Sequence, residues 1–350
     1  MGENILFDDF EYLLNSELNL QKLKNKTILI TGATGLVGSY LIRFLLYCNK
    51  KENINVNILG VVRNIQKANE IFECYDTSNL KLIVSDLAKI NIIIEESIDY
   101  IVHAAAVTTS KMLVEEPVDA LKIAINGTQT ILDLARKKNT LATVYLSSME
   151  VYGQPSSNGL VTENKLGSVN LSNIRSGYPE TKRMCEFMCN AYAEQYGMNV
   201  KIARLAQTFG AGILPNESRV FAQFAKNVID NKDIILHTAG KSEGNYVYIA
   251  DAVKAILLLL FNGAKGQPYN VVNENTHMTI KEMAKLVLTN FVSKKQKLII
   301  DIPSEDMGYA PDVHMRLSGE KIKKIGWQPY YDLADSYARL IDWLKSPLKY

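Results

Sequence analysis

The stretch TGATGLVG, from Thr31 to Gly38, decides the fold of this chain. It follows an apolar run, Lys26–Thr31, that is typical of a buried strand, and it opens a segment of helical periodicity, Leu36–Tyr47. Glycine lets the backbone approach a pyrophosphate, and the N-terminus of a helix supplies N–H donors to that group. The context therefore predicts a dinucleotide-binding loop, against the alternative of a tight turn that uses glycine for packing only.

Outward from this loop, short apolar runs alternate with helical stretches. Long helices are predicted at Val118–Lys138 and Tyr178–Tyr196. The other short runs, each predicted to be a strand, are Val56–Val62, Lys81–Val84, Tyr100–Ala104, Thr143–Leu146 and Val200–Leu205. Such alternation favours an α/β fold with a doubly wound parallel sheet.

Three regions are predicted along the chain. Residues 1–24 form an N-terminal helical extension, because apolar residues recur there near helical spacing, at Phe7, Phe10, Leu13, Leu14 and Leu18. Residues 25–210 form the dinucleotide-binding domain, to which later parts of the chain are expected to return. Residues 211–350 form mainly a smaller mixed lobe that binds the substrate over the carboxyl ends of the strands.

Composition excludes several classes of protein. The 350 residues are 47% hydrophobic and 22% charged, and the net charge of +2 gives no strong field for nucleic acid or an acidic membrane. The opening MGENILFDDF is not a secretory signal, and the longest apolar run, Ala255–Phe261, is far below the ~18 residues of a membrane span. Cys185 and Cys189 are interpreted as packing residues, so no metal site is expected. A reduced, cytoplasmic protein fits best.

Further candidate cofactor residues follow the later strands. Arg63 comes after the second strand, where it can pair with the 2′-phosphate of NADP, so NADP is slightly favoured over NAD; the alternative is a surface arginine. Asp86 can bond the adenine amino group, and His103 is interpreted as a packed histidine. The full set of predicted cofactor contacts is Gly32, Thr34, Gly35, Leu36, Val37, Gly38, Arg63, Asp86, Leu87, Ala104, Ala105, Tyr178 and Lys182.

A tyrosine and a lysine are the candidate catalysts. YPETK at 178–182 places Tyr178 and Lys182 on one face of a helix. A phenol is a poor base at neutral pH, but a nearby ammonium and an oxidised nicotinamide lower its pKa. Tyr178 could then take a proton from an alcohol while hydride leaves the same carbon. Glu150, in YLSSMEVYG at 145–153, either faces water at a strand end or belongs to the floor of an active site.

With these motifs the sequence resembles the extended short-chain dehydrogenase/reductase family, in its nucleotide-sugar epimerase and dehydratase branch. The resemblance covers residues 24–345 and depends on TGATGLVG at 31–38, HAAA at 103–106, SSMEVYG at 147–153, YPETK at 178–182 and the late pattern Gly326, Trp327, Pro329. It implies a Rossmann domain, a tightly bound NAD or NADP, a nucleoside-diphosphate sugar in the C-terminal lobe, and a homodimer formed through paired helices.

The resemblance also assigns roles, and this chain departs from the family pattern at three places. It implies a catalytic hydroxyl on Ser148 and a dehydratase or decarboxylase role for Glu150, whereas Met149 replaces the aspartic acid of glucose-type dehydratases. Gly244 stands where the family usually has an arginine that contacts the diphosphate, so Arg219 is the candidate to replace it. Ala124 stands at the family's asparagine position, and it is open whether Asn126 takes over that role.

The leading hypothesis is a 4,6-dehydratase-like enzyme that works through a transient 4-keto sugar nucleotide. The alternatives are a UDP-glucuronate decarboxylase, an NDP-sugar 4-epimerase and an NADPH-dependent ketosugar reductase, so the enzyme is most simply a lyase or an isomerase. A cofactor-binding protein without catalysis is disfavoured by the presence of Ser148, Tyr178 and Lys182. The sequence names neither the base nor the sugar.

Overall fold

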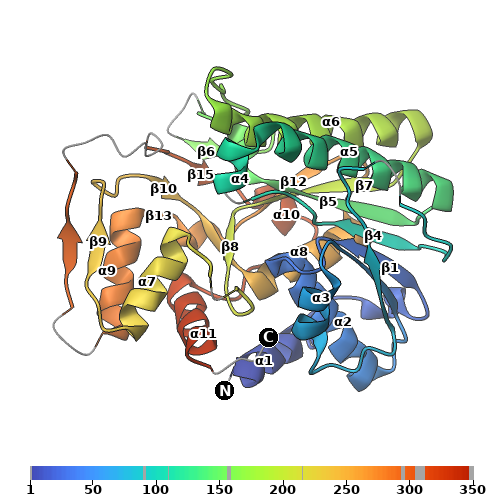
Figure 1. Ribbon diagram of the computed structural model, residues 1–350, viewed down its shortest axis with the longest axis horizontal. Coiled ribbons are helices and arrows are strands. Elements are labelled where there is room, and N and C mark those ends of the chain that lie inside the picture. Colours follow the sequence, from blue (N-terminus) through green and yellow to red (C-terminus); the bar gives the residue numbers. More distant parts are fainter. Residues whose placement is uncertain are drawn as a thin grey trace.

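Parallel strands form the central layer of the structure. The computed structural model describes residues 2–89, 92–108, 110–155, 159–214, 216–292, 296–303 and 312–346 (Figure 1). Within these residues one sheet has seven strands in the order β12-β7-β5-β4-β1-β2-β3, and every neighbouring pair is parallel. The strands are β1 (Thr27–Thr31), β2 (Asn57–Val62), β3 (Leu80–Val84), β4 (Tyr100–His103), β5 (Ala142–Ser148), β7 (Val200–Leu205) and β12 (Pro268–Val271). The predicted doubly wound parallel sheet is confirmed.

Helices cover both faces of this sheet because its strands are apolar on both sides. On one face lie α5 (Pro117–Lys138) and α6 (Gly177–Tyr196), and on the other lie α2 (Leu36–Glu52) and α8 (Ile249–Asn262), as Figure 1 shows. The two long helices predicted from the sequence begin and end within one residue of α5 and α6. Cys185 and Cys189 of α6 are buried in the apolar layer under that helix, as expected for packing residues.

Smaller elements of the later chain gather at one end of the sheet. Four two-stranded pairs form there: β8 (Gln207–Phe209) with β11 (Tyr246–Tyr248), β9 (Ile234–Leu236) with β14 (Leu298–Ile300), β10 (Glu243–Gly244) with β13 (Met278–Thr279), and β6 (Leu160–Val161) with β15 (Arg316–Leu317). The helices there are α7 (Val220–Ile229), α9 (Ile280–Phe291), α10 (Glu320–Lys323) and α11 (Leu333–Lys345). Because β12 and α8 lie after residue 210 yet belong to the large layer, the later chain does return to it.

Short helices complete the description. They are α3 (Ile65–Phe72), α4 (Ser110–Glu115) and the 3₁₀ turns η1 (Leu20–Leu23), η2 (Met149–Tyr152), η3 (Ile174–Ser176) and η4 (Glu274–Thr276). No helix in the described parts of the chain combines the length and the apolarity that crossing a bilayer requires.

The N-terminal helix α1 (Gly2–Leu14) is fastened to the body through a buried carboxylate. The Asp9 side chain is fully buried. It accepts hydrogen bonds from the hydroxyls of Tyr40 (2.9 Å), Tyr248 (2.7 Å) and Tyr331 (3.0 Å), and from Nη1 of Arg339 at 2.7 Å. Burial raises the pKa of Asp9 to about 6, although Arg339 and the tyrosines oppose the shift. One charged group therefore holds α1 against α2, β11 and α11.

Replacing Asp9 with Asn is expected to change how stability depends on pH. A carboxyl whose pKa is raised from 3.8 to about 6 on folding stabilises the fold at low pH, and that contribution is lost as pH rises through 6. Between pH 5 and pH 7 the wild type should lose roughly 1 kcal/mol more unfolding free energy than Asp9→Asn. Urea unfolding of both proteins at the two pH values measures this difference. An identical pH response of the two proteins would contradict it.

Candidate active site

The glycine loop lies against the chain that follows β4. Gly32 has a φ of +66°, and a Cβ at this residue would stand 2.9 Å from backbone atoms of Ala104 and Ala105. A Cβ at Gly38 would stand 2.3 Å from the carbonyl oxygen of Gly32. Gly35 caps α2 without any side-chain hydrogen bond, so the first-turn N–H groups of that helix are left for an anion. This cradle fits the pyrophosphate of a dinucleotide.

A buried histidine supports the cradle from below. Nδ1 of His103 lies 2.7 Å from the Thr31 hydroxyl, which accepts a hydrogen bond from the Ala105 N–H at 3.0 Å. Burial, with a smaller contribution from Lys182, lowers the pKa of His103 to about 3, so its ring is neutral. His103 is therefore a packed residue, as the sequence indicated, and it connects β1 to the end of β4.

Arg63 follows β2 and Asp86 follows β3, the next two strands on one side of β1, at the carboxyl edge of the sheet. Both side chains are exposed, whereas Leu87 is buried. Oδ1 of Asp86 accepts the Ala88 N–H at 3.1 Å, and Asn126 of α5 donates to the Ala88 carbonyl at 3.1 Å. Asn126 thus holds the turn that carries Asp86. The edge beyond the carboxyl ends of parallel strands is where this class of fold binds nucleotides.

Arg63→Ala tests which cofactor this edge prefers. If the guanidinium pairs with a 2′-phosphate, the variant should bind NADP about 10-fold or more weakly and bind NAD with nearly unchanged affinity, since a charge-assisted bond is lost only for NADP. Titration calorimetry with each dinucleotide measures both affinities. Equal affinities in the wild type and the variant would make Arg63 a surface residue without a cofactor role.

The candidate catalytic residues meet where β5 ends and α6 begins. Ser148 is the last residue of β5, and Glu150 lies in η2 directly after it. Tyr178 lies in the first turn of α6. The Ser148 side chain forms a hydrogen bond with the Tyr178 hydroxyl that favours the phenolate. Nζ of the buried Lys182 donates to the Leu146 carbonyl at 2.7 Å and lies 5.9 Å from the centre of the Tyr178 ring.

The charge state of Tyr178 differs from the sequence-based expectation. Burial raises the pKa of Tyr178 to about 12, the Glu150 carboxylate adds to the shift, and Ser148 and Arg219 oppose it. Burial also lowers the pKa of Lys182 to about 8. The pKa of Tyr178 is therefore raised in the protein itself, where a lowered value was expected, because desolvation penalises a phenolate. A positive charge placed beside the phenol, such as an oxidised nicotinamide, is what would restore it as a base.

Glu150 is a carboxyl group that can take up a proton. Its side chain is reached by solvent, yet the surrounding protein raises its pKa by desolvation, while Arg175 and Lys182 oppose the shift. Sequence reasoning missed Arg175; its position three residues before Tyr178, at the entry to α6, was the available signal. Glu150 therefore stands just after the end of β5 with a carboxyl whose charged form the surrounding protein disfavours.

Two departures from the family pattern lie next to each other. A Cβ at Gly244 of β10 would stand 3.7 Å from the methyl group of Met149. The two positions at which the family has an arginine and an aspartic acid are therefore neighbours here, and neither carries a charge. Arg219, the proposed replacement, donates to the Glu217 carboxylate at 2.7 Å and is about half exposed. Its positive charge nevertheless favours the phenolate form of Tyr178 and so opposes the raised pKa.

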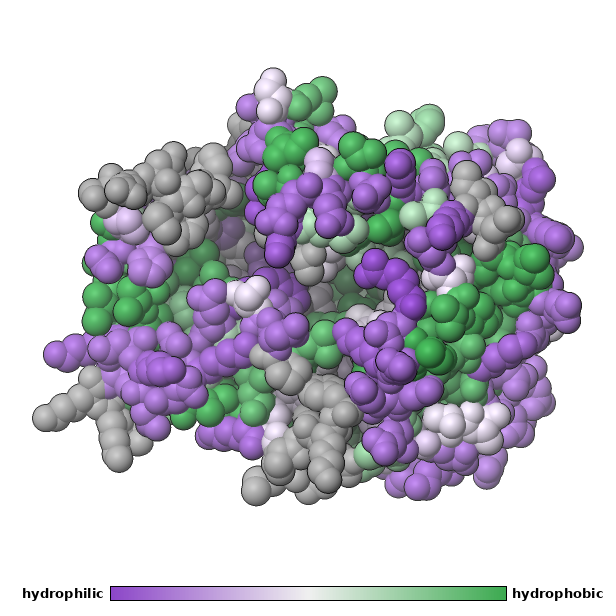
Figure 2. All heavy atoms as spheres, viewed as in Figure 1, coloured by the Kyte–Doolittle hydropathy of each residue, from purple (hydrophilic) through white to green (hydrophobic). Residues whose placement is uncertain are grey.

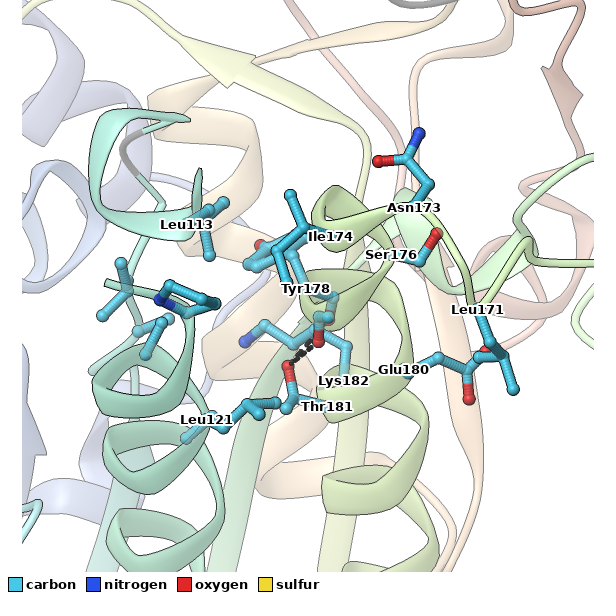
Figure 3. A pocket seen from close by; sticks show the side chains of 16 residues that line it. Leu113, Leu121, Leu171, Asn173, Ile174, Ser176, Tyr178, Glu180, Thr181 and Lys182 are labelled. Carbon is cyan, nitrogen blue, oxygen red and sulfur yellow. Dashed lines mark hydrogen bonds between the residues drawn. The ribbon is translucent and has the colours of Figure 1, made fainter. Parts of the chain in front are cut away.

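A cavity of about 180 Å³ adjoins Tyr178 and Lys182. Figure 3 shows Leu113 and Leu121 on its α4 and α5 side and Ile174, Tyr178 and Lys182 on its α6 side. The space-filling view in Figure 2 shows a hollow near the middle of the face, bordered by hydrophilic side chains. Among the described residues, no three His, Cys, Asp or Glu side chains are grouped so that they could hold a metal ion.

This fold and this cradle define a class: enzymes with a Rossmann-type sheet that bind a dinucleotide beside a tyrosine and a lysine. Within that class the chain belongs to the NAD dependent epimerase/dehydratase family, whose model matches residues 28–273. The recognition of the family from its motifs is thereby confirmed.

Curated relatives fall into more than one activity. The chain is 28% identical to UDP-glucuronic acid decarboxylase 1 of Danio rerio over 334 residues, which cover 95% of this chain and 75% of that protein. It is 25% identical to the human dTDP-D-glucose 4,6-dehydratase, with 91% of this chain and 90% of that protein covered. Among solved structures, dTDP-glucose 4,6-dehydratase from Bacillus anthracis in complex with NAD has a TM-score of 0.74 at 21% identity, covering 91% of this chain and 96% of that one.

Proposed function

We propose that this enzyme acts on a nucleoside-diphosphate sugar through a transient 4-keto form, and that it is a 4,6-dehydratase. The observation that carries the proposal is the carboxyl of Glu150, whose pKa is raised within the site of Tyr178. A carboxyl of this kind can remove the proton at C5 once a ketone at C4 has acidified it, and can then donate a proton to the departing hydroxyl at C6.

Each residue of the candidate site has one task in this scheme. Tyr178 takes the proton of the 4-hydroxyl, and Ser148 donates to the oxygen that becomes the ketone. Lys182 keeps a positive charge under the site and favours the phenolate. Glu150 takes the proton from C5 and releases the hydroxyl of C6 as water. When bound in the glycine cradle, the nicotinamide supplies the acceptor and later the donor of the hydride that moves from C4 to C6.

A decarboxylase is the second candidate. It is favoured by the relatives that are 28% identical and by Arg175, a cation beside Glu150 that could face the carboxylate of a hexuronate. Gly244 weakens it, because the family arginine near that carboxylate is missing. A 4-epimerase is less well supported, since it has no proton at C5 to move and a carboxylate there would be a net cost.

Product masses distinguish these reactions. The purified enzyme would be incubated separately with dTDP-glucose, UDP-glucose and UDP-glucuronate, and the products measured by mass spectrometry. The dehydratase proposal expects the loss of one water from a glucose nucleotide. Loss of carbon dioxide from UDP-glucuronate would establish the decarboxylase instead, and a product of unchanged mass that chromatography separates from the substrate would establish an epimerase. Consumption of added NADPH with a 4-keto sugar nucleotide as the substrate would indicate the ketosugar reductase.

The cofactor and the assembly complete the proposal. Membership of the family favours NAD as the cofactor. Arg63 is the residue that favours NADP, and the Arg63→Ala variant tests that preference. A homodimer through α5 and α6 is supported by apolar side chains that these helices expose, with 59% of Val118, 49% of Met184 and 67% of Phe187 accessible. Sedimentation measures the mass of the assembly. A cytoplasmic location stays a prediction.

A further inference from the structure

Arg204, buried near the end of β7, joins the two chain segments that carry the candidate catalytic residues. Its residue is only 4% exposed, and on the sheet it lies beside Ser147 of β5. Nε and Nη2 donate to the carboxylate of Glu186, with a shortest distance of 2.6 Å. Nη1 donates to the Tyr152 hydroxyl at 3.0 Å and to the Glu163 carbonyl at 2.7 Å.

The partners of this guanidinium stand next to the catalytic set in sequence. Glu186 lies one helical turn after Lys182 on α6. Tyr152 ends η2, the short turn that contains Glu150 and follows Ser148. One cation therefore bridges the helix of Tyr178 and the turn of Glu150, whose relative position sets how Ser148 meets Tyr178.

The same bonds continue into the C-terminal lobe. The Tyr152 hydroxyl donates to Oδ1 of Asn270 in β12 at 2.5 Å. Nδ2 of Asn270 donates to the Ser318 carbonyl at 3.0 Å and to the Val161 carbonyl at 3.3 Å. Val161 and the residue before Ser318 pair as β6 and β15. A substrate that contacts the lobe can thus act on the catalytic turn through groups already in contact.

Stability alone does not explain this cluster. A buried ion pair usually contributes little to folding, since the cost of desolvating both charges offsets their attraction, and apolar side chains of similar volume often do as well. Directional hydrogen bonds, such as those of Arg204, instead hold the groups that they join in one relative position. We infer that Arg204 is a positioning residue that fixes the Ser148–Glu150 segment against α6 and couples it to the C-terminal lobe. The inference rests on the proposed catalytic roles, though not on which sugar reaction occurs.

Two substitutions test the inference. Tyr152→Phe keeps the ring and removes the hydroxyl between Arg204 and Asn270, and Arg204→Lys keeps the charge but cannot make the forked contact. Lys201→Met is the matched control, because Lys201 is a buried cation on the same strand that donates only to the Leu260 carbonyl among the bonds found for it. Each protein is assayed at the same interval below its own melting temperature, with whichever of dTDP-glucose, UDP-glucose or UDP-glucuronate the wild type converts.

The expected result is a loss of kcat without a loss of cofactor. A small displacement in the site is costly, so kcat should fall at least ~10-fold in Tyr152→Phe and Arg204→Lys, while the Kd for NAD stays within about 2-fold and Lys201→Met keeps the wild-type kcat. Amide hydrogen exchange, which needs no substrate, should be about 10-fold faster in residues 149–153 of the two test variants only.

Two outcomes would overturn the inference. One is a lower melting temperature with wild-type kcat, which is what a purely structural ion pair would give; the other is unchanged exchange in residues 149–153. The proposed catalytic roles fail by a different result, namely activity retained in Tyr178→Phe, so the two failures can be told apart.

Discussion

Tyr178→Phe is expected to lower kcat by at least ~10²-fold, the usual scale for loss of a general base, while the cofactor remains bound. The substitution keeps the ring that packs at the start of α6 and removes only the oxygen that takes the proton. The pKa of Tyr178 also responds to several groups of the site, since the charges of Glu150 and Arg219 and the hydroxyl of Ser148 all act on it. Every enzymatic hypothesis for this chain needs a proton transfer at Tyr178, so the loss should appear with any substrate.

The pH dependence of the wild type gives an independent check on this role. Lys182 has a pKa lowered to about 8 by burial, so it loses its charge as pH rises through that value, and the support it gives to a phenolate disappears. Activity should therefore fall on the alkaline side. Tyr192→Phe is the matched control for Tyr178→Phe. Tyr192 lies on the same helix, but its hydroxyl donates to Asp133 at 2.8 Å. Near wild-type turnover of Tyr178→Phe would refute the assignment.

The parts of the fold that could be predicted are those whose signal is local. The strand before TGATGLVG, the helix after it and the two long helices α5 and α6 were found because apolar periodicity is contained in each segment. The catalytic residues could be proposed for the same reason, since YPETK places Tyr178 and Lys182 within one turn. The strand predicted at Thr143–Leu146 was also found, although β5 runs two residues further, to Ser148.

The contacts that could not be predicted join residues far apart in the chain. Asp9 meets Tyr248, Tyr331 and Arg339, which lie more than two hundred residues later, and no periodicity signals such a meeting. In the sequence Arg204 is, like Lys201, a charged residue within an otherwise apolar strand, and only the fold brings Tyr152 and Glu186 to it. A single sequence gives propensity and spacing, whereas these bonds depend on how the layers pack.

The raised pKa of Tyr178 is a further property that could not be predicted from the sequence. Spacing correctly placed Lys182 near the phenol, and an ammonium does favour a phenolate. The sequence could not supply the opposing costs, which come from burial and from the Glu150 carboxylate approaching across the site. The sign of a shift in a buried site is a balance of such contributions, so it follows from the three-dimensional surroundings and not from a motif.

Glu150→Gln is expected to stop the reaction after oxidation at C4 and before elimination. The amide is nearly the same size but cannot accept the proton from C5, so overall turnover should fall ~10²–10⁴-fold. Glu180→Gln is the matched control, because Glu180 is a carboxylate in the first turn of α6, near Tyr178 in sequence, that pairs with Arg183 at 2.9 Å. Both variants and the wild type would be incubated with a 6-hydroxylated sugar nucleotide in deuterated water.

The position of deuterium and the absorbance of the nicotinamide then decide the role of Glu150. In the wild type and in Glu180→Gln, the 6-deoxy product should carry solvent deuterium at C5, because the proton there is removed and replaced. Glu150→Gln should instead accumulate reduced nicotinamide and place no deuterium at C5. Wild-type turnover without exchange at C5 would refute the dehydratase role and favour a 4-epimerase. Release of carbon dioxide from a hexuronate nucleotide would favour a decarboxylase instead, in which the ketone at C4 alone makes the neighbouring carboxylate labile.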